Sequence, residues 1–458
     1  MRKIVWFVIF LLPFICFSQS SSSLKSARGI TWQDVGQPGF SEGIISSPKL
    51  AFSPDGKATI AFKDCARFGK ITVMQLDGTT WINLGTPGFS QGPASDISFA
   101  FSPSGQPYVS FSDSAYDEKV TVMKFNGTAW ELIGNPGFSA GRSVYTSLAF
   151  FDSDEPCVGF LDWGHNAKAT VMKYNGTNWI NIGEPGFSPA MAAFTSLAVD
   201  SLGRPWIAFS DGGDTNKTTV MNYNGTIWEI VGNRGFSRHD AGFQNMVFNP
   251  SGQPFVAFTD FTHHPIVKKY DGTVWVNEGE PNVIQDVIAH SLTLAFHSTG
   301  TPYIGFFDWG ITGKGQVMKY DGVNWNFVGT PDFTPGLAQD LTLAISPAGD
   351  PFVAFADFTN ASKASAMFYD ETVSINPHPD LGFTVSPNPV SSILSITFHE
   401  RYNDLQIELF NSAGTRLFIS TSPQDEVNID ISSYASGLYF IKVYNDTNMR
   451  LVKIIKSK

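Results

Sequence analysis

The sequence predicts an all-β fold: a closed seven-bladed β-propeller followed by a small antiparallel β-sandwich. Three observations predict the propeller. Tryptophan recurs with spacings of 49, 49, 49, 49, 47 and 50 residues, each repeat consists of strand-like segments alone, and an Asn-Gly or Asp-Gly turn recurs within the repeat. A period near fifty residues made only of strands is typical of propeller blades. The repeat tryptophans are Trp32, Trp81, Trp130, Trp179, Trp228, Trp275 and Trp325.

The chain begins with the pattern of a secretory signal. Two basic residues precede the apolar run Ile4–Cys16, and the small residue Ser18 follows it. We therefore expect a signal peptide over residues 1–18, with cleavage after Ser18, and a serine-rich linker over residues 19–29. The apolar run is too short to span a bilayer, so no transmembrane segment is expected after cleavage.

Each repeat holds four strands. In the third copy they are Trp130–Gly134, Thr146–Phe151, Cys157–Leu161 and Lys168–Tyr174, and strands in these positions are called D, A, B and C. Short connections between them predict an antiparallel meander, which is one propeller blade. The Asn-Gly or Asp-Gly pair between strands C and D predicts a type I′ turn, which has positive φ at both central residues.

The order of the strands predicts a closed ring. The chain starts with a lone D strand at residues 30–36 and ends with an A-B-C set at residues 341–368, and Ser374 stands where an eighth tryptophan is expected. We therefore expect the first strand to complete the last blade, within a propeller over residues 30–373. A linear array would leave two exposed edges and would have no reason for this offset.

A second β domain is expected over residues 381–458, after a linker at 374–380. Its alternating segments predict a small antiparallel sandwich. Five motifs resemble the C-terminal sorting domain of the type IX secretion system, of type A: Ser386–Pro389, Asn411–Gly414, Ile429–Ile431, Gly437–Lys442 and Lys453. The resemblance implies a secreted or outer-surface protein of a Gram-negative bacterium, with the type IX machinery as a partner of this domain.

Composition excludes some partners. The formal net charge is −11 and no basic cluster occurs in the body of the chain, so neither nucleic acid nor an anionic membrane is expected as a partner. No phosphate loop, metal signature or Ser-His-Asp order is recognisable, so no cofactor is expected. Cys65 and Cys157 fall at different points of different repeats, so no disulfide is expected between them.

The connections of a meander lie on two faces of the propeller. The A–B and C–D turns share one face, the turn face, and they repeat almost unchanged. The D–A and B–C loops share the other, the variable face, where we expect function. The aspartate that closes strand B recurs in every blade, with a lysine six residues later in six of them. We expect this pair to pin the B–C loop, and the repeat tryptophans to pack between blades.

Departures from the repeat are the candidate site. Three residues before the Leu-Ala-Phe motif of strand A, the blades in order carry Ser47, Asp96, Tyr145, Phe194, Phe243, Ser291 and Asp340. Aromatic, basic and histidine residues concentrate on the variable face of blades three to six. The candidate ligand-binding residues are Tyr116, Arg142, Tyr145, Trp163, His165, Arg238, His239, Phe243, His263 and Trp309. Adjacent His263 and His264 normally point apart, so no metal site is expected.

Aromatic platforms with a few polar groups suit a sugar ring. The leading hypothesis is therefore a secreted module that binds a polysaccharide or a glycoprotein glycan. The second is an enzyme on the same scaffold. A polysaccharide lyase would use Tyr145 with His165 or His239, beside Arg142 or Arg238, and a glycoside hydrolase would need Asp96 and Asp340 across the channel from one another. The third is a structural or adhesion protein.

Overall fold

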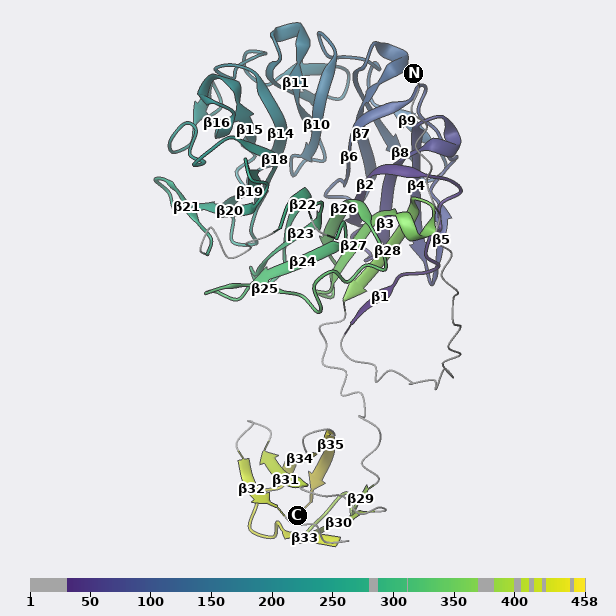
Figure 1. The fold of residues 1–458 in the computed structure, drawn as a ribbon, viewed down its shortest axis with the longest axis vertical. Helices are drawn as coiled ribbons and strands as arrows, with labels where there is room; N and C mark the ends of the chain where they lie inside the picture. The colour runs from purple at the N-terminus through teal and green to yellow at the C-terminus, as the bar shows by residue number, and fades with distance from the viewer. Residues whose placement is uncertain are drawn as a thin grey trace, which may run out of the picture. The chain divides into compact units, whose positions relative to one another are not determined.

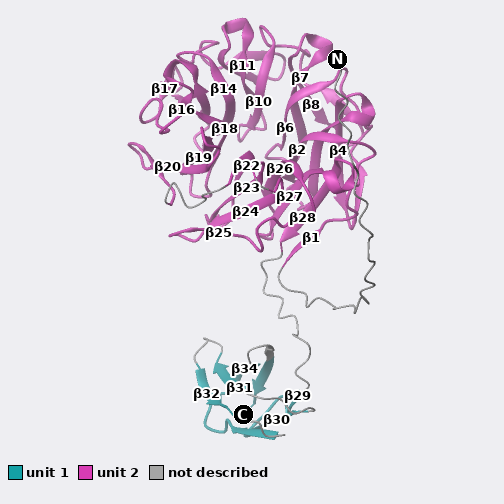
Figure 2. Cartoon of the chain, in the orientation of Figure 1, with its two compact units in different colours: residues 1–29, 373–458 teal, residues 30–372 magenta. Residues whose placement is uncertain are grey.

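The computed structural model describes residues 31–279, 287–310, 312–369, 383–398, 405–411, 416–421, 426–444 and 449–457. The predicted signal peptide and both predicted linkers lie outside these residues. The chain divides into two compact units (Figure 2), Ile30–Thr372 and a second unit that contains Val373–Lys458. No helix in the described ranges is long and apolar enough to cross a membrane.

The larger unit is a ring of seven four-stranded antiparallel sheets, the blades (Figure 1). Blade one is β2-β3-β4-β5, blades two to six follow in chain order, and blade seven is β26-β27-β28 with β1. The innermost strands are β2 (Ile45–Phe52), β6 (Ala94–Phe101), β10 (Ser143–Phe150), β14 (Ala192–Val199), β18 (Ala241–Phe248), β22 (Ala289–Phe296) and β26 (Ala338–Ile345).

The second strands, counted outward, are β3 (Ala58–Asp64), β7 (Pro107–Asp113), β11 (Pro156–Asp162), β15 (Pro205–Asp211), β19 (Pro254–Asp260), β23 (Pro302–Asp308) and β27 (Pro351–Asp357). The third are β4 (Lys70–Asp77), β8 (Lys119–Phe125), β12 (Lys168–Tyr174), β16 (Lys217–Tyr223), β20 (Pro265–Tyr270), β24 (Gly315–Tyr320) and β28 (Lys363–Tyr369). The outermost are β5 (Thr80–Asn83), β9 (Trp130–Leu132), β13 (Trp179–Asn181), β17 (Trp228–Ile230), β21 (Trp275–Asn277), β25 (Trp325–Phe327) and β1 (Trp32–Asp34).

The core lies between neighbouring blades, because each sheet is covered on both faces. Strand β7, for example, is buried at every residue. A phenylalanine near the middle of each second strand is at most 1% exposed: Phe62, Phe111, Phe160, Phe209, Phe258, Phe306 and Phe355. Burying a side chain of this size stabilises the fold by about 1.5–3 kcal/mol.

The repeat tryptophans join each blade to the preceding one. Every indole Nε1–H donates to a backbone carbonyl in the outermost strand region of that blade, and the indole of Trp179 donates to Ile133 O at 2.7 Å. In six blades the phenylalanine of the Gly-Phe-Ser or related loop stacks on the indole, as Phe138 does on Trp179 at 4.2 Å between ring centroids. The predicted packing role of the tryptophans is confirmed.

The ring closes as predicted. Trp32 of β1 pairs with Tyr369 of β28 in an antiparallel register. The Trp32 indole donates to Val328 O at 2.9 Å and stacks on Phe333 at 4.0 Å. The strand at the N-terminus of the propeller thus completes blade seven, and the contacts that join blade to blade continue without a break around the ring.

The aspartate at the end of each second strand pins a loop, but lysine is not its partner. In five blades it caps a 3₁₀ turn: η1 (Cys65–Arg67), η2 (Ser114–Tyr116), η3 (Trp163–His165), η4 (Gly212–Asp214) and η5 (Phe358–Asn360). Asp113, for example, accepts from the backbone N–H of Ala115 and of Gly92. No ion pair among the described residues joins one of these aspartates to the lysine six residues later. The lysine pairing was wrong because the buried carboxylate turns toward backbone donors of the loop.

The predicted hairpin between the third and fourth strands is present, but its turn is not type I′. In the turn at Asn126, only Gly127 has a positive φ, of 97°. The Asn126 carboxamide oxygen instead accepts from the N–H groups of Thr128 and Ala129. The side chain thus supplies the acceptor, which removes the need for a second left-handed residue.

The smaller unit is the predicted antiparallel sandwich. One sheet has the order β29-β30-β33, and the other has the order β32-β31-β34-β35. Their buried residues, such as Ile396, Ile407 and Ile441, form one apolar core. The strands are β29 (Phe383–Ser386), β30 (Ile393–Phe398), β31 (Gln406–Asn411), β32 (Arg416–Ser420), β33 (Glu426–Asp430), β34 (Gly437–Tyr444) and β35 (Met449–Lys456).

Candidate functional site

Each innermost strand of the propeller contains a β-bulge that turns one side chain into the central channel. In β10 the pairing register shifts between Val144 and Ser147, and Tyr145 within the bulge has a φ of 56°. The same position is left-handed in all seven blades, with φ between 50° and 57°. These seven residues line a cavity of about 330 Å³: Ser47, Asp96, Tyr145, Phe194, Phe243, Ser291 and Asp340.

Aromatic rings form a continuous arc along one side of this cavity. The ring centroids of Tyr145 and Phe194 are 4.8 Å apart, and those of Phe194 and Phe243 are 5.4 Å apart. The arc continues from Phe243 to His290 at 5.2 Å and from His290 to Trp309 at 5.7 Å. The Trp309 side chain is 57% exposed, so the arc runs from the channel to the solvent-facing loops of blade six.

Charged groups line the cavity in the neighbouring blades. Lys49 of β2 lies between the carboxylates of Asp340 in β26 and Asp96 in β6. Lys49 lines the channel and is exposed to the channel solvent. Burial lowers the pKa of Lys49, and the two carboxylates partly offset this effect. Burial also raises the pKa of Asp96, although that carboxylate accepts from the Tyr145 N–H at 2.9 Å.

Lys49 is one of the site residues that sequence reasoning missed, along with Gln244 and His290. The residue before the Leu-Ala-Phe motif is small and polar in the other six blades: Ser98, Ser147, Ser196, Asn245, Thr293 and Thr342. The side-chain oxygen of Ser98 accepts from the Leu148 N–H of the next blade at 3.0 Å, and three of the other blades repeat this bond. A lysine cannot accept it. Comparing this column of the repeats would have found Lys49 from the sequence.

Replacing Lys49 by serine should raise the free energy of unfolding by about 0.5–1.5 kcal/mol, because serine can accept the inter-blade hydrogen bond that four other blades make. Since burial lowers the pKa of Lys49 from its usual 10.5, the unfolded chain holds this proton more tightly. The free energy of unfolding of the wild type therefore rises with pH between the lowered pKa and 10.5. The difference in stability in favour of the variant should shrink over this range. Chemical denaturation at pH 7 and pH 10 measures both effects. A variant less stable than wild type at both pH values contradicts this placement of Lys49.

The structure brings four of the candidate ligand-binding residues together. Tyr145, Phe243 and Trp309 belong to the aromatic arc, and His263 stacks on His290 of that arc at 5.1 Å. The buried Nδ1 of His263 has no hydrogen-bond partner among the described residues. Burial and His263 lower the pKa of His290, which keeps its imidazole neutral near pH 7.

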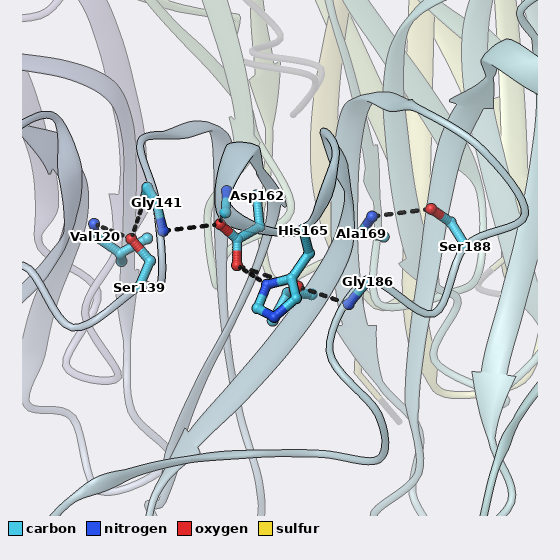
Figure 3. Close-up of polar contacts among 10 residues, drawn as sticks. Val120, Ser139, Gly141, Asp162, His165, Ala169, Gly186 and Ser188 are labelled. Carbon is cyan, nitrogen blue, oxygen red and sulfur yellow. Dashed lines mark hydrogen bonds and ion pairs between the residues drawn. The ribbon is translucent and has the colours of Figure 1, made fainter.

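The candidates in blades two and three lie in loops with structural contacts. Arg142 forms an ion pair with Glu118 at 2.5 Å. Its positive charge also acts to lower the pKa of Asp96. His165 Nδ1 lies 2.7 Å from Asp162 Oδ2, within the pinned loop that Figure 3 shows. Tyr116 and Trp163 lie in the 3₁₀ turns, and the Trp163 side chain is 55% exposed. No ring contact within the described ranges joins either of them to the arc.

Arg238 and His239 line a different cavity. It lies in blade five, has a volume of about 440 Å³ and shares no lining residue with the channel cavity. His239 meets Phe261 edge to face at 4.5 Å. His264 lies beside them, with its Nδ1 2.8 Å from Thr262 Oγ1.

The arrangement does not meet the geometric needs of the two enzyme hypotheses. Asp96 and Asp340 lie on β6 and β26, the two strands that flank β2, rather than across the channel from one another. Burial and Asp96 raise the pKa of Tyr145, which disfavours the phenolate that a lyase base requires. In the part of the chain that the structure describes, no three His, Cys, Asp or Glu side chains gather as metal ligands.

Comparison with known proteins identifies the second unit. Residues 384–457 match the family of secretion system C-terminal sorting domains. The predicted resemblance is confirmed: the chain carries a type IX sorting tail and is a secreted or cell-surface protein. None of the curated proteins compared with the chain matches it.

Solved structures similar to the chain include a bacterial surface protein, a fungal oxidase and a fungal lectin, all at low sequence identity. PorZ, a surface component of the type IX secretion system of Porphyromonas gingivalis, is 17% identical, with a TM-score of 0.48 over 90% of this chain and 59% of that one. A fungal alcohol oxidase in complex with copper is 12% identical, with a TM-score of 0.50 over 93% of this chain and 100% of that one. The fucose-specific lectin of Aleuria aurantia is 14% identical, with a TM-score of 0.42 over 64% and 98%. At these identities the likenesses concern the fold, not the activity.

Proposed function

We propose that this secreted propeller binds a glycan at the channel mouth of its variable face. The observation that carries the proposal is the aromatic arc, whose rings Tyr145, Phe194 and Phe243 share a cavity of about 330 Å³ with Lys49, Asp96 and Asp340. Cavities of roughly 300–1,000 Å³ with apolar walls and a few convergent polar groups are typical of small-ligand sites.

The chemistry of the two parts of the cavity suits a sugar. The C–H face of a pyranose packs on aromatic faces, and its hydroxyl groups need both donors and acceptors. The ammonium of Lys49 supplies donors, and the carboxylates of Asp96 and Asp340 supply acceptors. The Oε1 of Gln244, which also lines the cavity, is buried without a partner among the described residues, so it is a further acceptor that a hydroxyl would satisfy.

The outer end of the arc provides a test. Replacing Trp309 by alanine should weaken binding of a glycan about 5- to 15-fold, because an exposed ring in van der Waals contact with a sugar contributes on the order of 1–1.5 kcal/mol. Trp163→Ala is the matched control, since Trp163 is equally exposed on the same face but outside the arc. A glycan array on the purified chain first supplies the ligand, and calorimetry then compares the variants.

Comparing Trp309→Ala with Trp163→Ala shows whether the glycan binds at the channel mouth. Loss of binding in Trp309→Ala and no change in Trp163→Ala support the channel mouth. An equal loss in both variants would move the site to the general loop surface. An array without a single bound glycan would contradict the proposal and favour the adhesion hypothesis.

A further inference from the structure

Blade five departs from the other blades inside a strand, not only in its loops. In β20, Lys268 pairs with Val256 in the register. The residues at this register position in the other six blades are all methionine, and each is at most 9% exposed: Met74, Met123, Met172, Met221, Met318 and Met367. A cation therefore occupies a position that the fold otherwise reserves for an apolar side chain.

No residue of the described ranges pairs with the charge of the Lys268 side chain. It forms no hydrogen bond or ion pair with another residue of the described ranges, and burial lowers its pKa with no compensating carboxylate. The adjacent Lys269 differs, because it forms an ion pair with Glu278 at 2.6 Å. Lys268 is partly buried, and even partial burial of an unpaired cation has a desolvation cost, which the free protein bears unless something else recovers it.

A pocket opens in front of Lys268 because the loop of blade five is rebuilt. Its loop after the second strand is two residues shorter than in blades one to four, and Ile266 stands where Thr219 stands in blade four. In blade four that threonine hydroxyl accepts from the Gly235 N–H. Ile266 cannot do so. The aspartate of blade five, Asp260, is 18% exposed, against 1% for Asp162 and 0% for Asp211.

Among the described residues that line this pocket of about 440 Å³, positive charge exceeds negative charge. Lys268 and Arg238 line it with two histidines, His239 and His264. Asp260 is the one carboxylate among the described residues that line the pocket, and it already accepts from the N–H groups of Thr262 and His264 and from the Thr262 hydroxyl. The Arg238 side chain makes no hydrogen bond or ion pair with another described residue. Two unpaired cations thus converge on a cavity whose walls include three phenylalanine rings, Phe236, Phe258 and Phe261.

We propose that the blade-five pocket binds the anionic group of an acidic saccharide, a carboxylate or a sulfate ester. Lys268 and Arg238 bind the anion, and the Phe261–His239 pair meets the sugar ring. The proposal rests on the glycan-binding function proposed above and adds a second subsite with a defined charge. It explains why one blade keeps a lysine where six blades have methionine.

Lys268→Met tests the proposal without endangering the fold, since methionine fills this position in six blades. Calorimetry compares three tetrasaccharides: tetragalacturonate, its methyl ester and a sulfated galactan fragment. We expect wild type to bind at least one anionic tetrasaccharide, and Lys268→Met to weaken that binding roughly 10- to 100-fold, the usual effect of losing a charged hydrogen bond. Lys269→Met, on the same strand with its own partner, should bind like wild type. The thermal midpoint of Lys268→Met should equal or exceed that of wild type.

The outcomes separate this inference from the proposed function. Equal binding of the methyl ester, or an unchanged affinity in Lys268→Met, overturns the anionic subsite. If neutral glycans bind and neither anionic tetrasaccharide does, the subsite is wrong and the channel mouth stands. If anionic binding depends on Lys268 and no channel variant changes any binding, the subsite stands and the channel mouth is wrong. The carboxylated and sulfated probes show which anion is recognised.

Discussion

Replacing Trp32 by alanine should lower the free energy of unfolding by about 3–5 kcal/mol, the range for removing a buried large aromatic side chain. Trp32 is 7% exposed, donates to Val328 O and stacks on Phe333. It also starts the three-residue strand β1, which supplies the fourth strand of blade seven, while the segment after it adds further hydrogen bonds to β28, such as Val35 N–H to Ala366 O. Without this anchor β1 detaches, and β28 becomes an unpaired edge. Chemical denaturation measures the loss.

Trp179→Ala is the matched control for ring closure. Trp179 makes the same two contacts, with Ile133 O and Phe138, but its strand is continuous with the chain on both sides. We expect a similar loss of packing energy in both variants, whereas amide hydrogen exchange in β28 should accelerate only in Trp32→Ala. Unchanged protection of β28 in Trp32→Ala would show that β1 does not hold the ring closed.

Replacing Phe194 by serine should raise the dissociation constant for a bound glycan roughly 10- to 100-fold. Phe194 is the centre of the aromatic arc, between Tyr145 and Phe243. Burial of the Phe194 ring under a sugar contributes about 1.5–3 kcal/mol to the binding free energy. Serine suits the left-handed backbone here, because Ser47 and Ser291 occupy the equivalent position with φ of 52° and 56°. Calorimetry with the glycan identified on the array measures the change.

Phe68→Ser is the control for this effect. Phe68 lies in a loop of the variable face, is 86% exposed and also has a positive φ, of 58°. The Phe68→Ser variant should bind the glycan with the affinity of the wild type. A loss in Phe68→Ser as large as in Phe194→Ser would mean that any exposed aromatic ring on this face contributes, and that the channel mouth has no special role.

The fold could be predicted from the sequence because its signal is repeated. Seven tryptophans at a nearly constant spacing, and a first strand without a blade, predict both the blade number and the closure through β1. Repetition averages out local ambiguity, since a pattern that is weak in one copy is strong over seven. The turn type was wrong because a side-chain acceptor, as in Asn126, replaces a backbone conformation.

Side-chain partners were harder to predict, because register does not show where a side chain turns. Asp162 stands opposite Lys168 in the register, yet it accepts from Gly141, Gly164 and His165. The candidate column containing Tyr145 does line the channel, because the bulge turns every member of it inward. Lys49 and Lys268 were missed for one reason: departures were sought in the loops and in the column of Tyr145, whereas both lysines stand in other columns of the strands.

A crystal structure of the chain with a glycan identified on the array would show where the sugar binds. We expect a sugar ring in van der Waals contact with Phe194 and Phe243, with hydroxyl groups within hydrogen-bond distance of Lys49 and of Asp96 or Asp340. A glycan bound on the turn face, or between the outer strands of blades away from the channel and the blade-five pocket, would contradict it.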